Sequence, residues 1–145
     1  MQTRKLQVER APRIEMDLFN KLKDMEILLI DDDEWIRDSL CLFFESEGCR
    51  LTALETAEEG MKALKKHDYD ILVTDYRLPG MDGLEFLRRI QDMQPQVMKV
   101  LITAYKSEDI VSEAIRLGVQ DFIEKPFTTK TIEESLTRLV QEHEQ

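Results

Sequence analysis

The sequence predicts an α/β fold: five parallel strands in the order 2-1-3-4-5, with helices on both faces of the sheet. From Met25 onward, short apolar runs alternate with helical patterns, which is typical of βα units and a parallel sheet. The first, third and fourth runs are nearly continuous in Val, Ile and Leu, as expected for strands covered on both faces. The second and fifth contain polar residues, as edge strands do. With those two strands at the edges, right-handed crossovers make 2-1-3-4-5 the simplest order.

The individual elements follow from the spacing of apolar residues. A recurrence every three or four positions predicts each helix, and Gly48 and Gly118 stand just past two helix ends, where a left-handed conformation is cheapest for glycine. The predicted strands are 27–30, 50–54, 71–73, 97–102 and 119–123, and the predicted helices are 34–47, 57–67, 83–93, 107–117 and 129–143.

Composition limits the classes of function. The 145 residues are 42% hydrophobic and 34% charged, which suits one globular domain. A net charge of −10 argues against non-specific binding to nucleic acid or to an anionic membrane. No apolar run approaches the roughly 18 residues of a membrane helix, and two cysteines make no disulfide framework. We therefore expect a cytoplasmic domain that binds neither membrane nor nucleic acid directly.

The first 24 residues differ in charge from the rest of the chain. They hold six basic and four acidic residues, a balance of +2, so that residues 25–145 carry −12. This shift predicts an N-terminal extension over 1–24 and a main domain over 25–145. Ile14, Leu18 and Leu22 recur every four positions and predict a short amphipathic helix in the extension. It is either an accessory segment or a helix for contact with a partner or a second copy.

Polar residues with chemical potential follow four of the five strands. In such a sheet the functional crevice lies at the carboxyl ends of strands one and three, where the winding direction changes. Two carboxylates about 4 Å apart repel by roughly 4 kcal/mol at an effective dielectric near 20, and a hard cation such as Mg²⁺ relieves this. A lysine adds a further positive charge. The residues are Asp31, Asp32 and Asp33 after strand one, Asp75 at the end of strand three, Thr103 at the end of strand four, and Lys125 after strand five.

Each of these residues also has a plainer interpretation. An acidic triplet after a strand commonly caps the next helix and occupies its first turn, and this is the favoured role of Asp33 and Glu34. A lone Asp, Thr or Lys-Pro at a strand end is more often loop chemistry. It is the joint placement at four strand ends that predicts a site.

Four segments together resemble the receiver domain of bacterial two-component response regulators. They are ILLIDDD at 27–33, LVTDYRLPGMDG at 72–83, LITA at 101–104 and FIEKPF at 122–127. The resemblance covers about residues 25–143, in the order and spacing of the family. The segment around Asp75 is similar to receivers attached to enhancer-binding transcription activators, whereas residues 1–24 lie outside the usual pattern.

The resemblance implies a phosphoacceptor signalling domain and not an enzyme in its own right, although receivers assist their own phosphorylation and dephosphorylation. Asp75 would take a phosphoryl group from a phosphohistidine on a sensor histidine kinase or a histidine phosphotransfer protein. Asp32, Asp75 and the backbone carbonyl of Arg77 would bind Mg²⁺ directly, and Asp31 would act through water.

The same resemblance assigns the remaining crevice residues. Lys125 and the Thr103 hydroxyl, with backbone N–H groups near the small Ala104, would hold the phosphoryl oxygens, and the Lys125–Pro126 peptide would be cis. Phosphoryl transfer depends mainly on such positioning and charge neutralisation. Tyr105 and Arg77 would flank the attacking water in dephosphorylation, with Tyr105 shielding it; alternatively both side chains point into solvent.

Phosphorylation must also be reported elsewhere in the molecule. In receivers a Thr or Ser moves toward the phosphoryl group and an aromatic residue of strand five turns inward; here these are Thr103 and Phe122. Phe122 is alternatively a plain core residue. The surface formed by 107–117, 119–123 and 129–143 would be the output or homodimer surface, and residues 1–24 are a second candidate for dimer contact.

Three other interpretations remain. A pseudo-receiver would have the same fold and serve as an interaction module without being phosphorylated. A Mg²⁺-dependent phosphatase of the haloacid dehalogenase type would use an Asp-x-Asp after strand one, but leaves Asp75 and Lys125 unexplained. A flavodoxin-type FMN binder needs a Ser/Thr/Gly-rich loop there, and an acidic triplet repels phosphate. The sequence does not tell whether an output domain follows Gln145.

Overall fold

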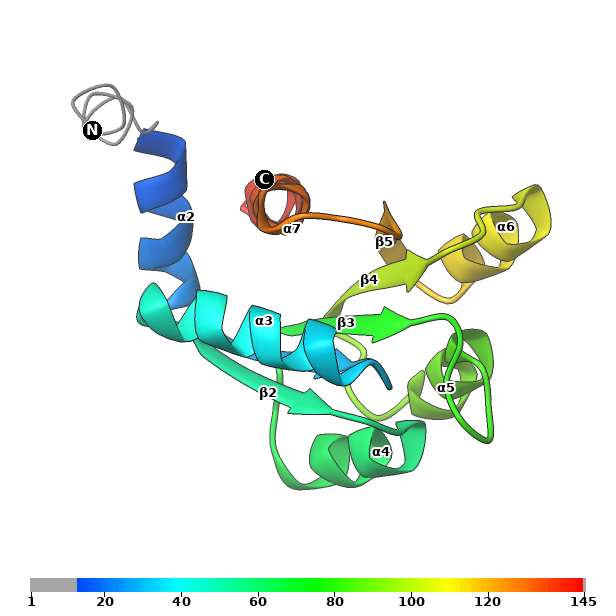
Figure 1. Ribbon diagram of the computed structural model, residues 1–145. Helices are drawn as coiled ribbons and strands as arrows, with labels where there is room; N and C mark the ends of the chain where they lie inside the picture. The colour runs from blue at the N-terminus through cyan, green and yellow to red at the C-terminus, as the bar shows by residue number, and fades with distance from the viewer. Residues whose placement is uncertain (1–12, 145) are drawn as a thin grey trace.

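The computed structural model describes residues 13–144, with side chains from Leu18 onward, and contains a five-stranded parallel sheet (Figure 1). The strand order is β2-β1-β3-β4-β5, so the predicted order and the predicted edge strands are both confirmed. The strands are β1 (Glu26–Ile30), β2 (Arg50–Leu54), β3 (Ile71–Asp75), β4 (Met98–Thr103) and β5 (Val119–Glu124).

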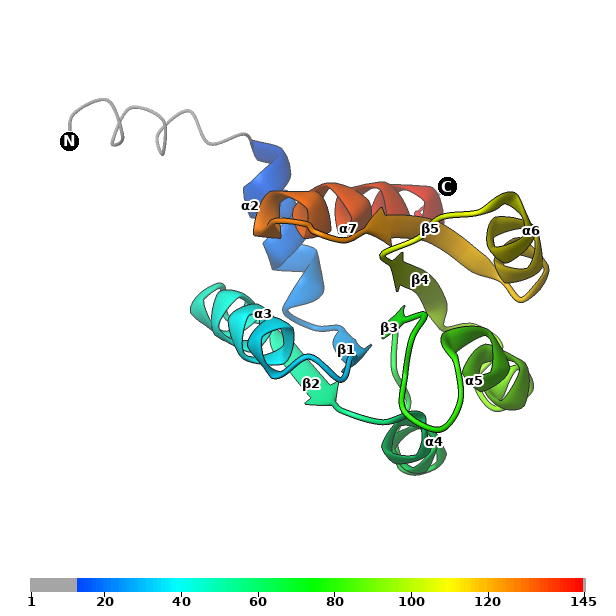
Figure 2. The same cartoon turned by 45° about the vertical axis from the view of Figure 1, so that its right-hand side comes forward.

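Helices cover both faces of the sheet, as predicted. Two apolar cores result, one under α2, α3 and α7 and the other under α4, α5 and α6. Figure 2 shows the two layers of helices on either side of the strands. None of these helices, within residues 13–144, is long and apolar enough to cross a membrane. The helices are α2 (Arg13–Leu22), α3 (Glu34–Ser46), α4 (Ala57–Lys66), α5 (Gly83–Ile90), α6 (Glu108–Arg116) and α7 (Thr129–His143).

Helix α5 ends three residues before the predicted position 93, because the chain there is tied to its neighbours through Gln94. The side-chain amide of Gln94 donates to the carbonyls of Leu64 and His67, at 2.7 Å each, and its oxygen accepts the Tyr69 N–H at 2.8 Å. These bonds pair two carbonyl groups at the end of α4 and one N–H group just before β3. The loop between α5 and β4 therefore serves as a structural clamp, at the opposite end of the sheet from the crevice.

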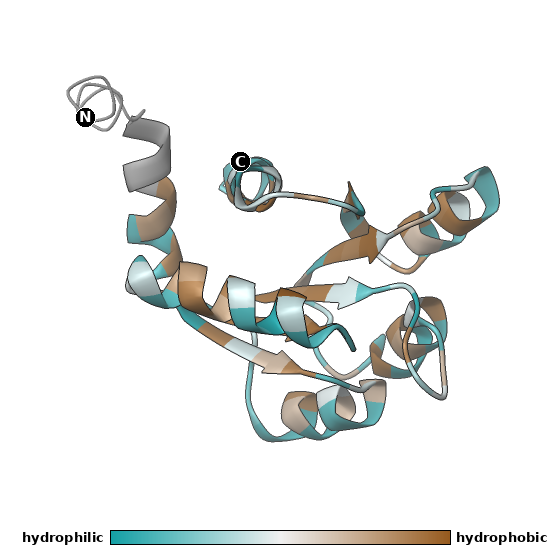
Figure 3. Ribbon diagram, viewed as in Figure 1, coloured by the Kyte–Doolittle hydropathy of each residue, from teal (hydrophilic) through white to brown (hydrophobic). Residues whose placement is uncertain are grey.

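Helix α2 packs on the main domain. Leu18, Phe19 and Leu22 are buried in the same core as α3 and α7, and the Phe19 ring meets the edge of Phe43 at 5.7 Å between centroids. Figure 3 shows the hydropathy of each residue along the ribbon, with hydrophobic segments on the helices and strands in brown. The division of the chain at Asp24 stays a prediction, but the helix predicted from the spacing of Leu18 and Leu22 is present and its described apolar side chains face this core. Residues 1–12, and the side chain of Ile14, lie outside the described part of the chain.

Candidate functional site

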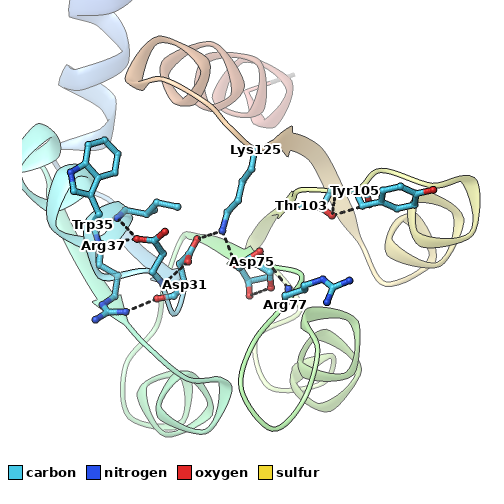
Figure 4. A network of polar contacts seen from close by, with 11 residues as sticks. Asp31, Trp35, Arg37, Asp75, Arg77, Thr103, Tyr105 and Lys125 are labelled. Carbon is cyan, nitrogen blue, oxygen red and sulfur yellow. Dashed lines mark hydrogen bonds and ion pairs between the residues drawn. The ribbon is translucent and has the colours of Figure 1, made fainter.

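The carboxyl ends of four strands bring the predicted polar residues to one edge of the sheet. Asp31 follows β1, Asp75 ends β3, Thr103 ends β4 and Lys125 follows β5. Figure 4 shows Asp31, Asp75 and Lys125 turned toward one another. Asp31, Asp75 and Thr103 are almost wholly buried, with 0%, 4% and 2% of their surface exposed. This is the crevice that the winding of the sheet predicts.

Three carboxylates converge in the crevice. Asp31, Asp32 and Asp75 each offer an oxygen, and these oxygens lie within 4.8 Å of one another. Burial, and then the neighbouring charge of Asp75, raise the pKa of Asp31 to about 6, although the Asp33 N–H and Lys125 act in the opposite direction. Asp31 Oδ2 is buried and takes no hydrogen bond of good geometry from the described residues. A buried oxygen of this kind, beside two other carboxylates, fits a divalent cation with oxygen ligands.

Lys125 is the cation that faces these carboxylates. Its Nζ donates to Asp75 Oδ2 at 2.9 Å and lies 3.2 Å from Asp31 Oδ2. Burial alone would lower the pKa of the Lys125 ammonium, but the hydrogen bond to Asp75 and the charges of Asp31 and Asp75 outweigh it and raise the pKa. The ammonium therefore stays charged and bridges two strand ends. The Lys125–Pro126 peptide is cis, as the resemblance implies.

Close packing fixes the backbone around Asp75. The Tyr76 N–H donates to the Ile102 carbonyl at 2.7 Å, and the Gly83 N–H donates to the Tyr76 carbonyl at 2.6 Å. A Cβ at Gly83 would lie 2.5 Å from the Asp75 carbonyl oxygen, so the start of α5 approaches β3 as closely as only glycine allows. Asp75 Oδ1 accepts the Arg77 N–H at 3.4 Å. The carboxylate is thus held in place by strands, loop and helix together.

Asp33 has the plainer role predicted for it. Its Oδ1 accepts the N–H groups of Trp35 and Ile36, at 2.9 and 3.2 Å, and so caps α3, while Glu34 lies in the first turn. Of the acidic triplet, therefore, only Asp31 and Asp32 belong to the carboxylate cluster.

Thr103 lies at the edge of the crevice with its hydroxyl engaged elsewhere. Thr103 Oγ1 donates to the Tyr105 carbonyl and accepts the Tyr105 N–H, both at 3.0 Å. Ala104 is exposed, and the Tyr105 ring points away from Asp75 and is 72% exposed (Figure 4). The Arg77 side chain is exposed as well. The proposed roles of these residues in phosphoryl binding and dephosphorylation stay predictions.

Phe122 occupies a half-buried position on β5, packed against the core under α6. The Lys106 ammonium lies over its ring, 5.6 Å from the centroid. The role of Phe122 as a switch residue stays a prediction.

An apolar groove of about 620 Å³ opens beside the carboxylates, a feature that the sequence did not predict. It runs between the start of α3 and the loop from β5 to α7. Trp35 stands at its rim and is 75% exposed. The other lining residues include Ile36 and Leu40 of α3, and Pro126 and Phe127 of the loop. Neighbouring apolar residues on two unconnected segments leave no periodic signal, so the groove emerges only in the folded chain.

Sequence analysis also missed Arg37, whose Nη1 donates to the Asp31 carbonyl at 2.9 Å. A single arginine in a helical pattern is typical of a side chain on the solvent-exposed face of the helix. What could have drawn attention to it is its place one turn into the helix that follows the acidic triplet.

Fold and crevice together define a doubly wound α/β domain in which a lysine bridges two carboxylates of an acidic centre. A family model, the response regulator receiver domain, matches residues 27–137. The chain belongs to this family. It is therefore a receiver domain of the two-component type, a phosphoacceptor signalling domain, and this membership rules against the phosphatase and flavodoxin interpretations.

Individual relatives agree. The transcriptional regulatory protein FixJ of Bradyrhizobium diazoefficiens is 37% identical over 101 residues, which cover 70% of this chain and 49% of that protein. The chemotaxis protein CheY-3 of Vibrio cholerae is 36% identical over 122 residues, covering 81% of this chain and 92% of that protein. The solution structure of the beryllofluoride-activated NtrC4 receiver domain dimer is similar with a TM-score of 0.74 at 30% identity, over 81% of this chain and 97% of that one. The chain spans about half the length of FixJ and about a quarter of the regulator DctD of Pseudomonas aeruginosa.

Proposed function

We propose that Asp75 is the phosphoacceptor and that it receives a phosphoryl group from a phosphohistidine on a sensor histidine kinase or a histidine phosphotransfer protein. One observation supports this assignment most strongly. Asp75 Oδ2 accepts a hydrogen bond from the Lys125 ammonium at 2.9 Å, within a cluster of three carboxylates at the carboxyl ends of the strands. Among the side chains that the structure describes, those of residues 18–144, this is the one group of three or more carboxylates close enough to share a cation.

Transfer of the phosphoryl group from histidine to Asp75 needs no further reactant. An Asp75 carboxylate oxygen forms a bond to phosphorus, the bond between phosphorus and the histidine nitrogen breaks, and its electron pair stays on the imidazole. Such a transition state spreads charge over the peripheral phosphoryl oxygens, and catalysis consists mainly of positioning and neutralisation. Lys125, already beside Asp75, supplies one fixed positive charge.

Asp31, Asp32 and Asp75 are the residues that would hold Mg²⁺, with the Arg77 carbonyl as a further ligand by resemblance to the family. The ion would neutralise phosphoryl charge and the mutual repulsion of the carboxylates. Asp31 is wholly buried, and among the described residues its Oδ2 has the ion pair with Lys125 but no hydrogen bond of good geometry, which supports this set.

Thr103 and Phe122 are the proposed switch. For Thr103 to contact a phosphoryl group, its hydroxyl must leave the Tyr105 backbone, to which it makes two hydrogen bonds. Its departure would free the loop between β4 and α6, and with it the surface of α6, β5 and α7. Phosphorylation shifts the population only if it stabilises this second arrangement more than the first. The activated NtrC4 receiver is a dimer, and this likeness supports a homodimer here, for which the surface of α6, β5 and α7 is the proposed contact.

Tyr105 keeps its proposed role of shielding the attacking water only if the loop moves, because its ring now points away from Asp75. Arg77 and Ala104 are both exposed, and Ala104 lines the same groove as Lys125. The phosphodonor protein would contact the apolar groove, whose lining includes Lys125.

Intact-mass spectrometry after incubation with Mg²⁺ and acetyl phosphate tests the assignment. We expect one added phosphoryl group on the wild type, none on Asp75→Asn and none in EDTA. Asp68→Asn, an exposed residue at the other end of the sheet, is the matched control and should behave as the wild type. A wild type without added phosphate would establish the pseudo-receiver interpretation instead, and a phosphorylated Asp75→Asn would place the acceptor elsewhere.

A further inference from the structure

Asp31 lies where the chain leaves the sheet. The register of β1 with β2 and with β3 ends at Ile30, paired with Leu54 and Thr74. Beyond it, the Asp31 N–H still donates to the Leu54 carbonyl at 3.0 Å. The Asp31 carbonyl is past the last paired residue and needs a donor from outside the ladder.

Arg37 provides that donor. It stands one turn into α3, where its own N–H donates to the Asp33 carbonyl at 3.1 Å. Its Nη1 reaches back to the Asp31 carbonyl at 2.9 Å, a partly buried contact that joins the helix to the end of the strand. In Figure 4 the Arg37 guanidinium meets the Asp31 backbone, whereas Lys125 meets the Asp31 carboxylate from another direction.

This contact fixes the peptide plane between Asp31 and Asp32. The Asp31 carboxylate is restrained as well, because the Asp33 N–H donates to Asp31 Oδ1 at 2.9 Å. Both the carbonyl and the side chain of Asp31 are therefore held. The carboxylates of Asp31, Asp32 and Asp75 repel one another, and Asp32 is exposed and able to swing outward. A restrained backbone keeps the Asp31 and Asp32 carboxylates directed at the same point.

We propose that Arg37 is a positioning residue for divalent-cation binding: its bond to the Asp31 carbonyl holds the turn in which Asp31 and Asp32 converge. The inference rests on the proposed function of the carboxylate cluster. The sign of the effect separates positioning from charge. A nearby positive charge repels a cation, so its removal alone would strengthen binding, whereas loss of the positioning bond weakens it.

The test compares Arg37→Met, which removes the donor and the charge but keeps a long stem, with Arg37→Lys, which keeps both. Mg²⁺ binding is followed by amide NMR shifts, and hydrogen exchange of the amides of residues 32–34 is measured without metal. Arg116→Met, an exposed arginine on α6, is the matched control. If Arg37→Met does not fold, Arg37→Gln takes its place.

We expect Arg37→Met to weaken Mg²⁺ binding by about three- to tenfold, the effect of losing one hydrogen bond, and to speed amide exchange in 32–34. Arg37→Lys should restore most of the affinity. Unchanged or tighter binding in Arg37→Met, or equal weakening in the lysine variant, would overturn the proposal. A wild type that binds no Mg²⁺ would instead contradict the proposed function of the cluster.

Discussion

Replacing Asp31 by Asn should stabilise the metal-free protein at neutral pH while impairing the site. The Asp31 carboxylate is wholly buried, and burial together with the charge of Asp75 raises its pKa from 3.8 to about 6. A carboxyl group whose pKa is raised on folding stabilises the folded protein when the pH is below the pKa that the group has in the unfolded chain. That stability is lost as the pH rises through about 4 to 6, when the folded protein must hold a buried charge.

The size of the effect follows from the gap between the two pKa values. About two pKa units correspond to about 3 kcal/mol at pH 7.5, as an upper value. Asn also gives up the ion pair with Lys125, whose Nζ lies 3.2 Å from Asp31 Oδ2. We therefore expect Asp31→Asn to raise the free energy of unfolding by about 1 to 3 kcal/mol above pH 6, and to have little effect near pH 4.

Urea unfolding in EDTA, repeated from pH 4 to pH 8, measures this difference. Asp68→Asn is the control, because that side chain is exposed and far from the cluster. Added Mg²⁺ should stabilise the wild type more than Asp31→Asn. If Asp31→Asn were less stable than the wild type at pH 7.5 without metal, or if the difference did not depend on pH, burial of the charged Asp31 carboxylate would not destabilise the metal-free protein.

Three further changes test other parts of the structure. Leu22→Ala should lower the free energy of unfolding by about 2 to 5 kcal/mol in urea, because this α2 side chain is fully buried; a change near zero would show that α2 does not belong to the core. Gly83→Ala should cost about 1 to 3 kcal/mol, since its Cβ would meet the Asp75 carbonyl oxygen at 2.5 Å, and should slow phosphorylation in an acetyl phosphate assay; wild-type values would contradict the close approach. Lys125→Met should reduce the rate of phosphorylation at least about tenfold in the same assay, because one fixed charge beside Asp75 is lost, and an undiminished rate would remove Lys125 from the mechanism.

The sheet was predictable because its signals are local. Apolar runs gave β2 at 50–54 without error, and β1, β4 and β5 within one residue at either end. The third strand continues two residues beyond the predicted 73, through Thr74 and Asp75, because the polar residues that end it still pair with β4. The polar residues Thr74 and Asp75 mark the end of the apolar run, but the hydrogen-bonded pairing of β3 with β4 continues through them.

The meeting of Asp31 and Asp75 was predictable from the strand order together with the placement of polar residues at the strand ends. Once β1 and β3 are neighbours, Asp31 and Asp75 must lie close together, and the structure places Lys125 between them. Side-chain directions were not predictable in this way. The Thr103 hydroxyl chooses between the crevice and the Tyr105 backbone, and that choice depends on the fold of a loop with no periodic pattern.

Contacts between elements distant in the sequence were also beyond the sequence patterns. The spacing of Leu18 and Leu22 predicts an apolar helix face, but it does not say whether a partner or this domain covers it. Burial of Phe19 against Phe43 answers that question for the described residues, because α3 and α7 leave an apolar surface for it.

A crystal structure of the protein with Mg²⁺ and beryllofluoride, which mimics a phosphoryl group, would show whether Asp75 is the phosphoacceptor and where the cation binds. We expect beryllium bonded to an Asp75 carboxylate oxygen, Lys125 beside a fluoride, and Mg²⁺ held among Asp31, Asp32 and Asp75. An analogue bound to another residue, or a crevice in which these three aspartates share no cation, would contradict this expectation.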